Sequence, residues 1–252
     1  VQVFRELGLS EIVAINPNGI TTAAAGPYSN LTLKEARAKI IEELNSAGFL
    51  KKVEDILHRT PLCERSKTPI EIIPLEDYYL KQIEFIPKLK TLADKMNFYP
   101  PMHKQILINW LNSITIDWPI SRRRFYGTEI PVWYCNNCKT PNIPDSTLTD
   151  RYYRPWKERP PFEKCMACNC TDFTGEDRIF DTWMDSSITP LYITRYKRDQ
   201  RFHKYTYPAT IRPQAKDIIR TWLHYSMLRC FQLTDKMPWS MAWIMGFGVD
   251  ER

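Results

Sequence analysis

The sequence predicts an α/β protein that carries an inserted zinc ribbon, and two patterns support this fold class. The strand-like segments "YPATIRP" (residues 207–213) and "MAWIMGF" (241–247) stand on either side of the helical segment "KDIIRTWLHYSMLRCFQLT" (216–234). A strand, a crossover helix and a second strand form a parallel pair within one sheet. The second pattern is a repeated Cys-x-x-Cys in the loop-rich region before these strands. With 252 residues, 43% of them hydrophobic, the chain can bury the core of one large or two modest domains.

Net charge and hydropathy indicate which partners and which cellular location to expect. The 35 Lys and Arg residues exceed the 29 Asp and Glu residues, for a net charge of +6. This surplus favours approach to a phosphate backbone, but it is also common in proteins that touch no nucleic acid. No apolar run of membrane-spanning length and no secretion leader is present, so we expect a cytoplasmic protein that contacts no membrane. The chain begins without Met and stops just after a strand, so we expect it to be part of a longer protein.

The first half of the chain predicts several short elements. Thr32 and Glu35 form a capping box at the start of an amphipathic helix that Gly48 closes. The proline-punctuated stretch 59–74 predicts strands and turns. Two short helices follow, within residues 86–101 and 103–113.

Six of the seven cysteines lie between residues 135 and 230. Cys135 with Cys138, and Cys165 with Cys168, form two Cys-x-x-Cys knuckles, the ligand pattern of a tetrahedral zinc site. Disulfides and a redox motif fit less well, because the context is cytosolic and two pairs share one irregular segment. Four cysteine ligands leave no open position, so this zinc is expected to be structural.

The other three cysteines are not expected to be the main zinc ligands. Cys170 lies two residues after Cys168, where it is either a substitute ligand or a bystander. Cys63 is expected to be a packed or free thiol, and Cys230 a buried residue of the crossover helix.

Four segments in a fixed order carry a family resemblance: "DWPISRRRFYGTEIPVWYC" (117–135), "FDTWMDSS" (180–187), "RPQAKDIIRTWLHYSMLRC" (212–230) and "WIMGFGVDE" (243–251). Together with the zinc ribbon they resemble the class I aminoacyl-tRNA synthetases for branched aliphatic amino acids, and most closely the valine enzymes of archaeal type. The resemblance runs from end to end. It implies the second half of a Rossmann-like catalytic core with an inserted zinc ribbon, preceded by the C-terminal part of a mainly β editing domain.

The resemblance also implies domain boundaries. Residues 1–75 would close the editing domain, and 76–133 would return the chain to the catalytic core. Residues 134–178 would form the zinc ribbon, and 179–252 the second half of the Rossmann-like domain.

Site residues follow by similarity to the valine enzymes. Trp183, Ile218 and Trp222 would wall the pocket for the aliphatic side chain, although Ile218 and Trp222, four apart on a helix, also suit ordinary core packing. Asp217 and Gly246 would lie at the ATP ribose. We expect Asp217 to be the N-cap of the crossover helix, and pure capping is the alternative to ribose binding.

The cluster of Arg122, Arg123 and Arg124 offers a further contact. Consecutive side chains point in different directions, so one or two of them, with Arg122 and Arg124 as candidates, would face the acceptor end of tRNA or the ATP region. The alternative is a mixture of solvated charge and ion pairs with nearby acids.

The implied function is a portion of a valine–tRNA ligase that uses valine, ATP with magnesium, and tRNA(Val). A pocket that excludes larger side chains by size cannot strongly reject threonine, as is known for the valine enzymes, so hydrolytic editing is expected in the whole enzyme. A fragment of an isoleucyl- or leucyl-tRNA synthetase, or a non-catalytic zinc-ribbon module that binds RNA, are the alternatives.

Departures from the family pattern concern the nucleotide. No histidine is followed by x-Gly-His, and the lysine-rich Lys-Met-Ser-Lys-Ser loop would follow Arg252. Without these groups the 252 residues alone are expected to be inactive. Ala215 stands where the family has glycine, and Met245 where it usually has histidine, so nucleotide contacts are expected to differ at these two positions.

Overall fold

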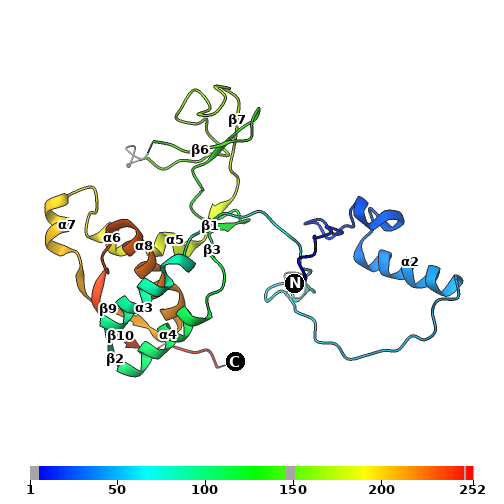
Figure 1. Ribbon diagram of the computed structural model, residues 1–252, viewed down its shortest axis with the longest axis horizontal. Coiled ribbons are helices and arrows are strands. Elements are labelled where there is room, and N and C mark those ends of the chain that lie inside the picture. The colour runs from blue at the N-terminus through cyan, green and yellow to red at the C-terminus, as the bar shows by residue number, and fades with distance from the viewer. Residues whose placement is uncertain (1–5, 146–150, 247, 252) are drawn as a thin grey trace. The chain divides into compact units, whose positions relative to one another are not determined.

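The computed structural model describes residues 6–145, 151–246 and 248–251. The chain divides into two compact units, Val1–Glu76 and Asp77–Arg252. Figure 1 shows the first unit in blue and cyan and the second in green to red. In the described residues, no helix has both the length and the apolar character needed to cross a membrane. The domain boundaries inside the second unit stay predictions.

The first unit contains the predicted capped helix. After a 3-10 helix, η1 (Ala23–Tyr28), α2 spans Leu33–Ser46. The Thr32 hydroxyl accepts a 3.3 Å hydrogen bond from the Glu35 amide, and the Glu35 carboxylate accepts a 2.8 Å bond from the Thr32 amide. Gly48 follows with φ of 72°, the left-handed conformation that glycine adopts without strain. The capping box and the glycine stop are therefore confirmed.

The strands expected over residues 59–74 are wrong. Among the described residues of the first unit there is no strand, only the isolated bridges Ile15↔Thr21, Ile20↔Thr32 and Leu62↔Pro69. A strand needs a partner along its length, and the prolines that punctuate this stretch remove amide donors. The mainly β character expected of residues 1–75 is accordingly not seen in the part of this unit that the structure describes.

A parallel sheet forms the base of the second unit. Its strands are β2 (Asn97–Tyr99), β10 (Trp239–Met245) and β9 (Ala209–Ala215), in that spatial order, and both pairings are parallel. The predicted strand–helix–strand crossover from β9 to β10 is confirmed. The end of the helix expected over residues 86–101 is wrong: α3 stops at Lys95, and β2 lies inside the expected range because it pairs with β10. Phe247, expected in the last strand, lies outside the described residues.

Helices cover this sheet and supply most of the core. The two predicted short helices are α3 (Ile86–Lys95), preceded by η2 (Ile83–Phe85), and α4 (Lys104–Ser113), preceded by η3 (Pro101–His103). They pack with α8 (His224–Thr234) around fully or almost fully buried side chains, among them Leu89, Leu107, Leu111, Leu223 and Met227.

The crossover begins with irregular turns. A 3-10 turn, η4 (Lys216–Ile218), and a π-helical turn, η5 (Ile219–Leu223), precede α8. The prediction that Asp217 is the N-cap is wrong. The chain stays extended through Ala215, which takes the capping position, and Asp217 lies inside the first turn. A π turn is wider than an α turn and occurs often at functional sites.

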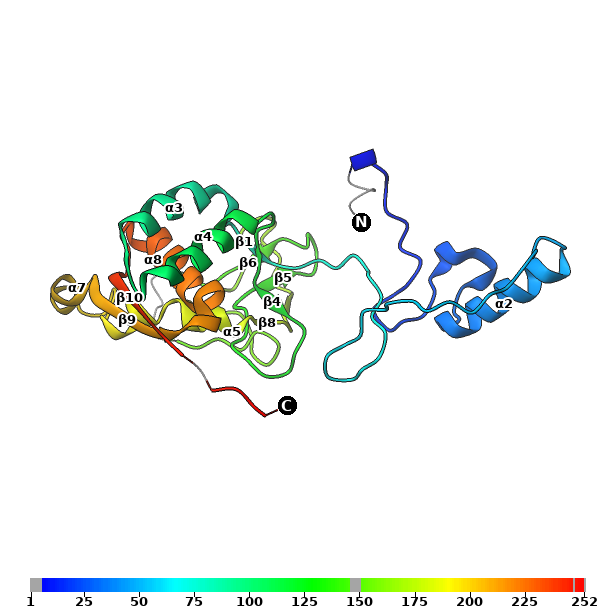
Figure 2. The same ribbon diagram turned by 90° about the horizontal axis from the view of Figure 1, so that it is seen from below.

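Two short antiparallel pairs join the sheet-bearing body to the cysteine-rich region. β1 (Tyr79–Leu80) pairs with β3 (Trp118–Pro119), and β4 (Ser121–Arg122) pairs with β8 (Ile179–Phe180). Residues 123–178, between β4 and β8, are called the cysteine insert below. Figures 1 and 2 place its strands at the end of the second unit opposite to the parallel sheet.

The cysteine insert has its own antiparallel sheet, in the order β6 (Pro141–Asn142), β5 (Trp133–Cys135) and β7 (Phe173–Gly175). A Cβ atom on Gly175 would lie 1.9 Å from the Pro155 carbonyl oxygen, so only glycine allows this close approach of two backbones. After β8 come α5 (Thr182–Ser187), α6 (Thr189–Ile193) and α7 (Gln200–Thr206).

A fully buried histidine makes the second unit sensitive to acid. His224 Nε2 lies 3.0 Å from Gln82 Oε1. Burial lowers the pKa of His224 to about 3. In the unfolded chain His224 has its ordinary pKa near 6.5. Between this pH and about 3 the unfolded chain therefore binds a proton at His224, and the folded chain does not. Stability is lost as the pH falls from about 6.5 toward 3.

We expect His224→Gln to flatten this dependence. Between pH 7 and pH 5 the free energy of unfolding should fall by about 2 kcal/mol less in the variant than in the parent. Urea titrations at the two pH values measure the difference, whatever the absolute stability of the variant. Parallel losses in both proteins would contradict the assignment.

Candidate functional site

The carboxylate of Asp181 joins three segments of the candidate site. Its Oδ2 accepts a 3.2 Å bond from Trp118 Nε1 and a 2.7 Å charge-assisted bond from Arg122 Nη2. Its Oδ1 accepts from the Trp183 amide at 3.2 Å, so Asp181 also caps α5. Asp181 is buried, and these partners satisfy a charge that would otherwise be costly to bury. These bonds fix the start of α5 and therefore the position of Trp183 in its first turn.

The three arginines have different surroundings, as expected. Arg122 binds Asp181 and the carbonyls of Pro119 and Ser121. Arg123 pairs with Asp77 at 2.9 Å, and Arg124 is exposed. Arg122 is thus engaged in a structural ion pair, the alternative that the sequence left open. Arg124 is the member of the candidate pair that keeps an exposed side chain.

The predicted pocket residues lie on three elements: Trp183 on α5, Ile218 on η4 and Trp222 on η5, and η5 packs against both α5 and η4. Trp183 is half-buried against the main core. Trp222, also half-buried, donates from Nε1 to the Ser186 carbonyl at 3.0 Å, which ties η5 to α5. Ile218 is half-buried at the end of η4. The hydrogen bond gives the Trp222 indole a defined orientation, which a pocket wall requires.

A buried arginine beside Trp222 was missed by the sequence reasoning. Arg212 on β9 is 9% exposed, and its guanidinium carbon lies 3.1 Å from the centroid of the Trp222 ring and 5.0 Å from that of Trp239. Burial lowers the pKa of Arg212 to about 10, and its Nε and Nη2 have no hydrogen-bond partner among the described residues. The signal in the sequence is alternation: Arg212 and Gln214 both face inward from β9.

The carboxyl ends of β9 and β10 bring the predicted nucleotide residues to one sheet edge. In the parallel register Met245 lies opposite Ala215, so the two positions that depart from the family pattern are neighbours. Asp217, which is exposed, follows β9 by two residues, and Gly246 follows β10 directly. A Cβ atom on Gly246 would meet nothing within 4 Å. Ligands of α/β sheets bind at this edge.

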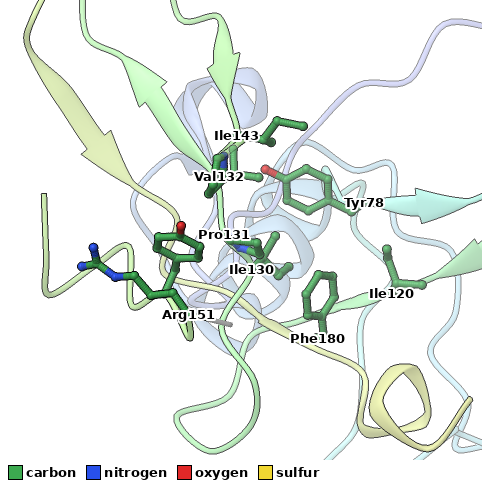
Figure 3. Close-up of a pocket in the computed structure, with 10 residues that line it drawn as sticks. Tyr78, Ile120, Ile130, Pro131, Val132, Ile143, Arg151 and Phe180 are labelled. Carbon is green, nitrogen blue, oxygen red and sulfur yellow. The ribbon is translucent and has the colours of Figure 1, made fainter. Parts of the chain in front are cut away.

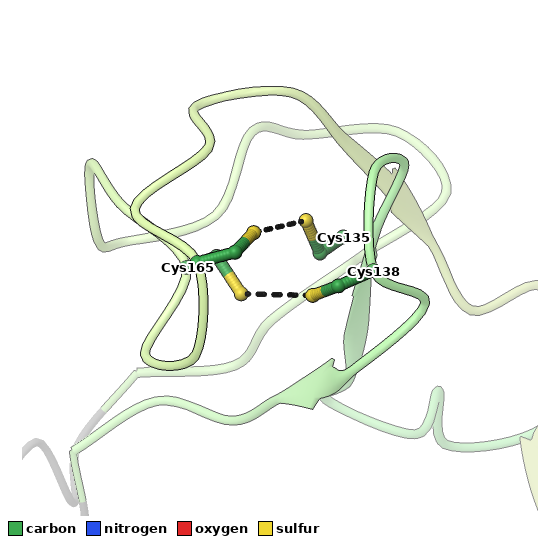
Figure 4. A group of neighbouring side chains, drawn as sticks. Cys135, Cys138 and Cys165 are labelled. Carbon is green, nitrogen blue, oxygen red and sulfur yellow. Dashed lines mark hydrogen bonds between the residues drawn. The ribbon is translucent and has the colours of Figure 1, made fainter.

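The four predicted zinc ligands come together in the cysteine insert. The sulfur atoms of Cys135, Cys138, Cys165 and Cys168 all lie within 4.8 Å of one another. Figure 4 shows the two knuckles facing each other. Cys135 Sγ lies 3.5 Å from Cys168 Sγ, and Cys138 Sγ lies 3.6 Å from Cys165 Sγ. Tetrahedral zinc with bonds of about 2.3 Å separates its sulfur ligands by about 3.8 Å, so this donor set fits the ion.

Neighbouring groups favour the thiolate at Cys138 and Cys165, whereas the pKa of Cys135 is raised. Hydrogen bonds from the side chain and backbone of Thr140, and from Cys168, lower the pKa of Cys138 to about 6. Asn142 Nδ2 lies 3.7 Å from Cys165 Sγ. Cys170 is outside the group of four. The sequence prediction for Cys230 is confirmed, since it is buried in α8.

An apolar cavity of about 550 Å³ lies between the cysteine insert and the adjoining strands. Figure 3 shows Tyr78, Ile120 and Phe180 on one side and Ile130 and Val132 on another. Beside it, the Tyr134 hydroxyl donates to Glu176 at 3.0 Å, and Glu176 pairs with Arg178 at 2.6 Å. Burial raises the pKa of Glu176, but its bonds to Arg178 outweigh burial and lower the value to about 2. None of the predicted pocket residues lines this cavity.

The sequence has close relatives over its whole length. Over the whole chain, the sequence is 47% identical to a valine–tRNA ligase of Aeropyrum pernix, 44% to one of Pyrobaculum aerophilum and 45% to one of Nanoarchaeum equitans. The chain spans 30%, 31% and 33% of the lengths of these relatives.

A family model described as "tRNA synthetases class I (I, L, M and V)" matches residues 28–252. Because this match covers most of the chain, including the crossover, the cysteine insert and the segment around Asp181, the chain belongs to the class I tRNA synthetases.

Proposed function

We propose that the protein containing this chain activates valine with ATP and transfers it to tRNA(Val). Three relatives that align with the whole chain at 44–47% identity are named valine–tRNA ligases. The observation that carries the proposal within the molecule is the bond from Trp222 to the Ser186 carbonyl, which fixes one indole against the helix that bears the other, Trp183. Two indoles and Ile218 offer rigid apolar walls for a small branched side chain.

The chemistry needs no nucleophile from the protein. The valine carboxylate attacks the α-phosphate of ATP and pyrophosphate leaves, after which a hydroxyl of the terminal ribose of tRNA attacks the carbonyl and AMP leaves. The protein contributes by orienting the reactants and by stabilising charge. Asp217, exposed beyond the end of β9, would accept hydrogen bonds from the ATP ribose, and Gly246 would border the nucleotide. Magnesium would accompany ATP, and Arg124 would contact tRNA or the ATP region.

Zinc would have a structural role in the same protein. Cys135, Cys138, Cys165 and Cys168 would hold it, and the ion would brace the two knuckles of the cysteine insert. Threonine has nearly the shape of valine, so we further propose that the whole protein hydrolyses mischarged threonine. A protein with this role would work in the cytoplasm.

A pocket walled by Trp222 predicts a selective loss of valine affinity on truncation. In the whole protein, Trp222→Ala should raise the KM for valine in ATP–pyrophosphate exchange by about tenfold or more, because apolar contacts of this size are worth roughly 1–3 kcal/mol. The KM for ATP should change far less.

Trp156→Ala is the matched control, since Trp156 is a partly exposed indole in the cysteine insert. An unchanged KM for valine in Trp222→Ala would exclude the pocket assignment. Exchange that depends on isoleucine or leucine instead of valine would replace the proposed substrate.

The zinc assignment predicts a defined metal content. Purified protein should hold one zinc ion at this site by elemental analysis, and the double variant Cys135→Ser/Cys168→Ser should lose it. Cys170→Ser should keep the ion, because Cys170 lies outside the four-sulfur group. Zinc loss in Cys170→Ser alone, or zinc retention in the double variant, would contradict the ligand set.

A further inference from the structure

A short segment of the second unit holds most of the surplus positive charge of the chain. Residues 189–206, which form α6, α7 and the turn between them, are called the cationic platform. They contain five cationic side chains and one carboxylate, Asp199, a surplus of four in a chain whose total surplus is six. All five cations are exposed: Arg195, Lys197, Arg198, Arg201 and Lys204. Figures 1 and 2 both show α7 at the periphery of the unit, beside β9.

The inner side of the platform is rigidly attached to the core. Thr194 is buried, and its hydroxyl binds the Pro190 carbonyl at 2.7 Å and His203 Nδ1 at 3.0 Å. The His203 ring stacks on Tyr207 with centroids 4.8 Å apart. Tyr196 donates to the Leu233 carbonyl of α8 at 2.9 Å. The cations are thus presented from a preformed scaffold, so binding orders little additional chain.

The outer side combines the cations with aromatic rings. The guanidinium carbon of Arg195 lies 5.0 Å from the Phe202 ring centroid, and that of Arg198 lies 5.3 Å from the Tyr192 centroid. Arg195 also pairs with Asp199, with Nη1 3.8 Å from Oδ2. Tyr205 is 92% exposed. Exposed cations that donate to phosphates, beside an exposed ring such as Tyr205 on which a base can stack, are the chemistry that proteins use on RNA.

We propose that the cationic platform binds the phosphate backbone of the tRNA, at a surface separate from the pocket formed by α5 and η5. This inference rests on the proposed function, in that it takes tRNA as the RNA partner. An anionic membrane surface is the competing partner. The RNA is favoured because guanidinium groups cover two of the exposed rings, and because the chain belongs to a family of tRNA synthetases.

The test uses the whole protein and tRNA(Val) transcript, with binding measured across a series of salt concentrations. The platform variant Lys197→Gln/Arg201→Gln/Lys204→Gln leaves the stacked Arg195 and Arg198 in place. We expect it to bind tRNA at least tenfold more weakly at low salt, and to reduce the slope of log K against log salt by roughly 2, because each lost phosphate contact contributes about 0.7–0.9.

Two further variants serve as controls. Lys81→Gln/Lys88→Gln/Lys95→Gln removes three exposed lysines on and before α3, and it should keep the parental slope. Lys197→Arg/Lys204→Arg preserves the charge of the platform and should keep parental affinity.

ATP–pyrophosphate exchange with valine separates this inference from the proposed function, because exchange needs no tRNA. Absence of exchange in the parent would overturn the proposed function. Normal exchange together with parental tRNA affinity in the platform variant would overturn the inference alone. Loss of binding to phosphatidylserine-containing vesicles, with tRNA affinity intact, would assign the platform to a membrane and overturn it as well.

Discussion

The buried carboxylate of Asp181 is the interaction on which the rest of the site depends. A carboxylate this far from water must be matched by donors, and it finds them on three separate segments: Trp118, Arg122 and the amide of Trp183. These contacts join the strand that enters the cysteine insert to the helix that leaves it. The position of α5 is therefore fixed relative to β4, although 56 residues of the cysteine insert separate β4 from β8 in the sequence.

The crossover between β9 and β10 is the second constraint. A parallel pair needs its connection to cross the sheet, and here the connection starts as 3-10 and π turns before it becomes α-helical. The irregular start leaves Trp222 between the Ser186 carbonyl and the guanidinium of Arg212. An indole held at its edge and on its face has little rotational freedom. A rigid indole of this kind would suit the wall of the proposed amino-acid pocket.

Local patterns predicted the elements whose signals are local. The capped helix α2, the helices α3 and α4, the parallel pair and the four-cysteine group follow from periodicity and spacing. Features that depend on distant partners were missed or wrong. The strand β2 has only three residues and is defined by its pairing with β10, and residues 59–74 have strand-like composition without a partner strand. The role of Arg212 depends on its contact with the Trp222 ring, which forms only in the folded chain and has no local signal in the sequence.

The register of the parallel pair links the two positions at which the sequence is expected to depart from the family pattern. Ala215 and Met245 lie opposite each other in the register, and neighbouring strands are about 4.8 Å apart, so the two residues are close neighbours at the sheet edge. Residues in contact do not contribute independently to binding energies. Substitutions at 215 and 245 are therefore expected to be coupled, each one setting the space and polarity in which the other acts, and their history in related sequences is best followed as that of a pair.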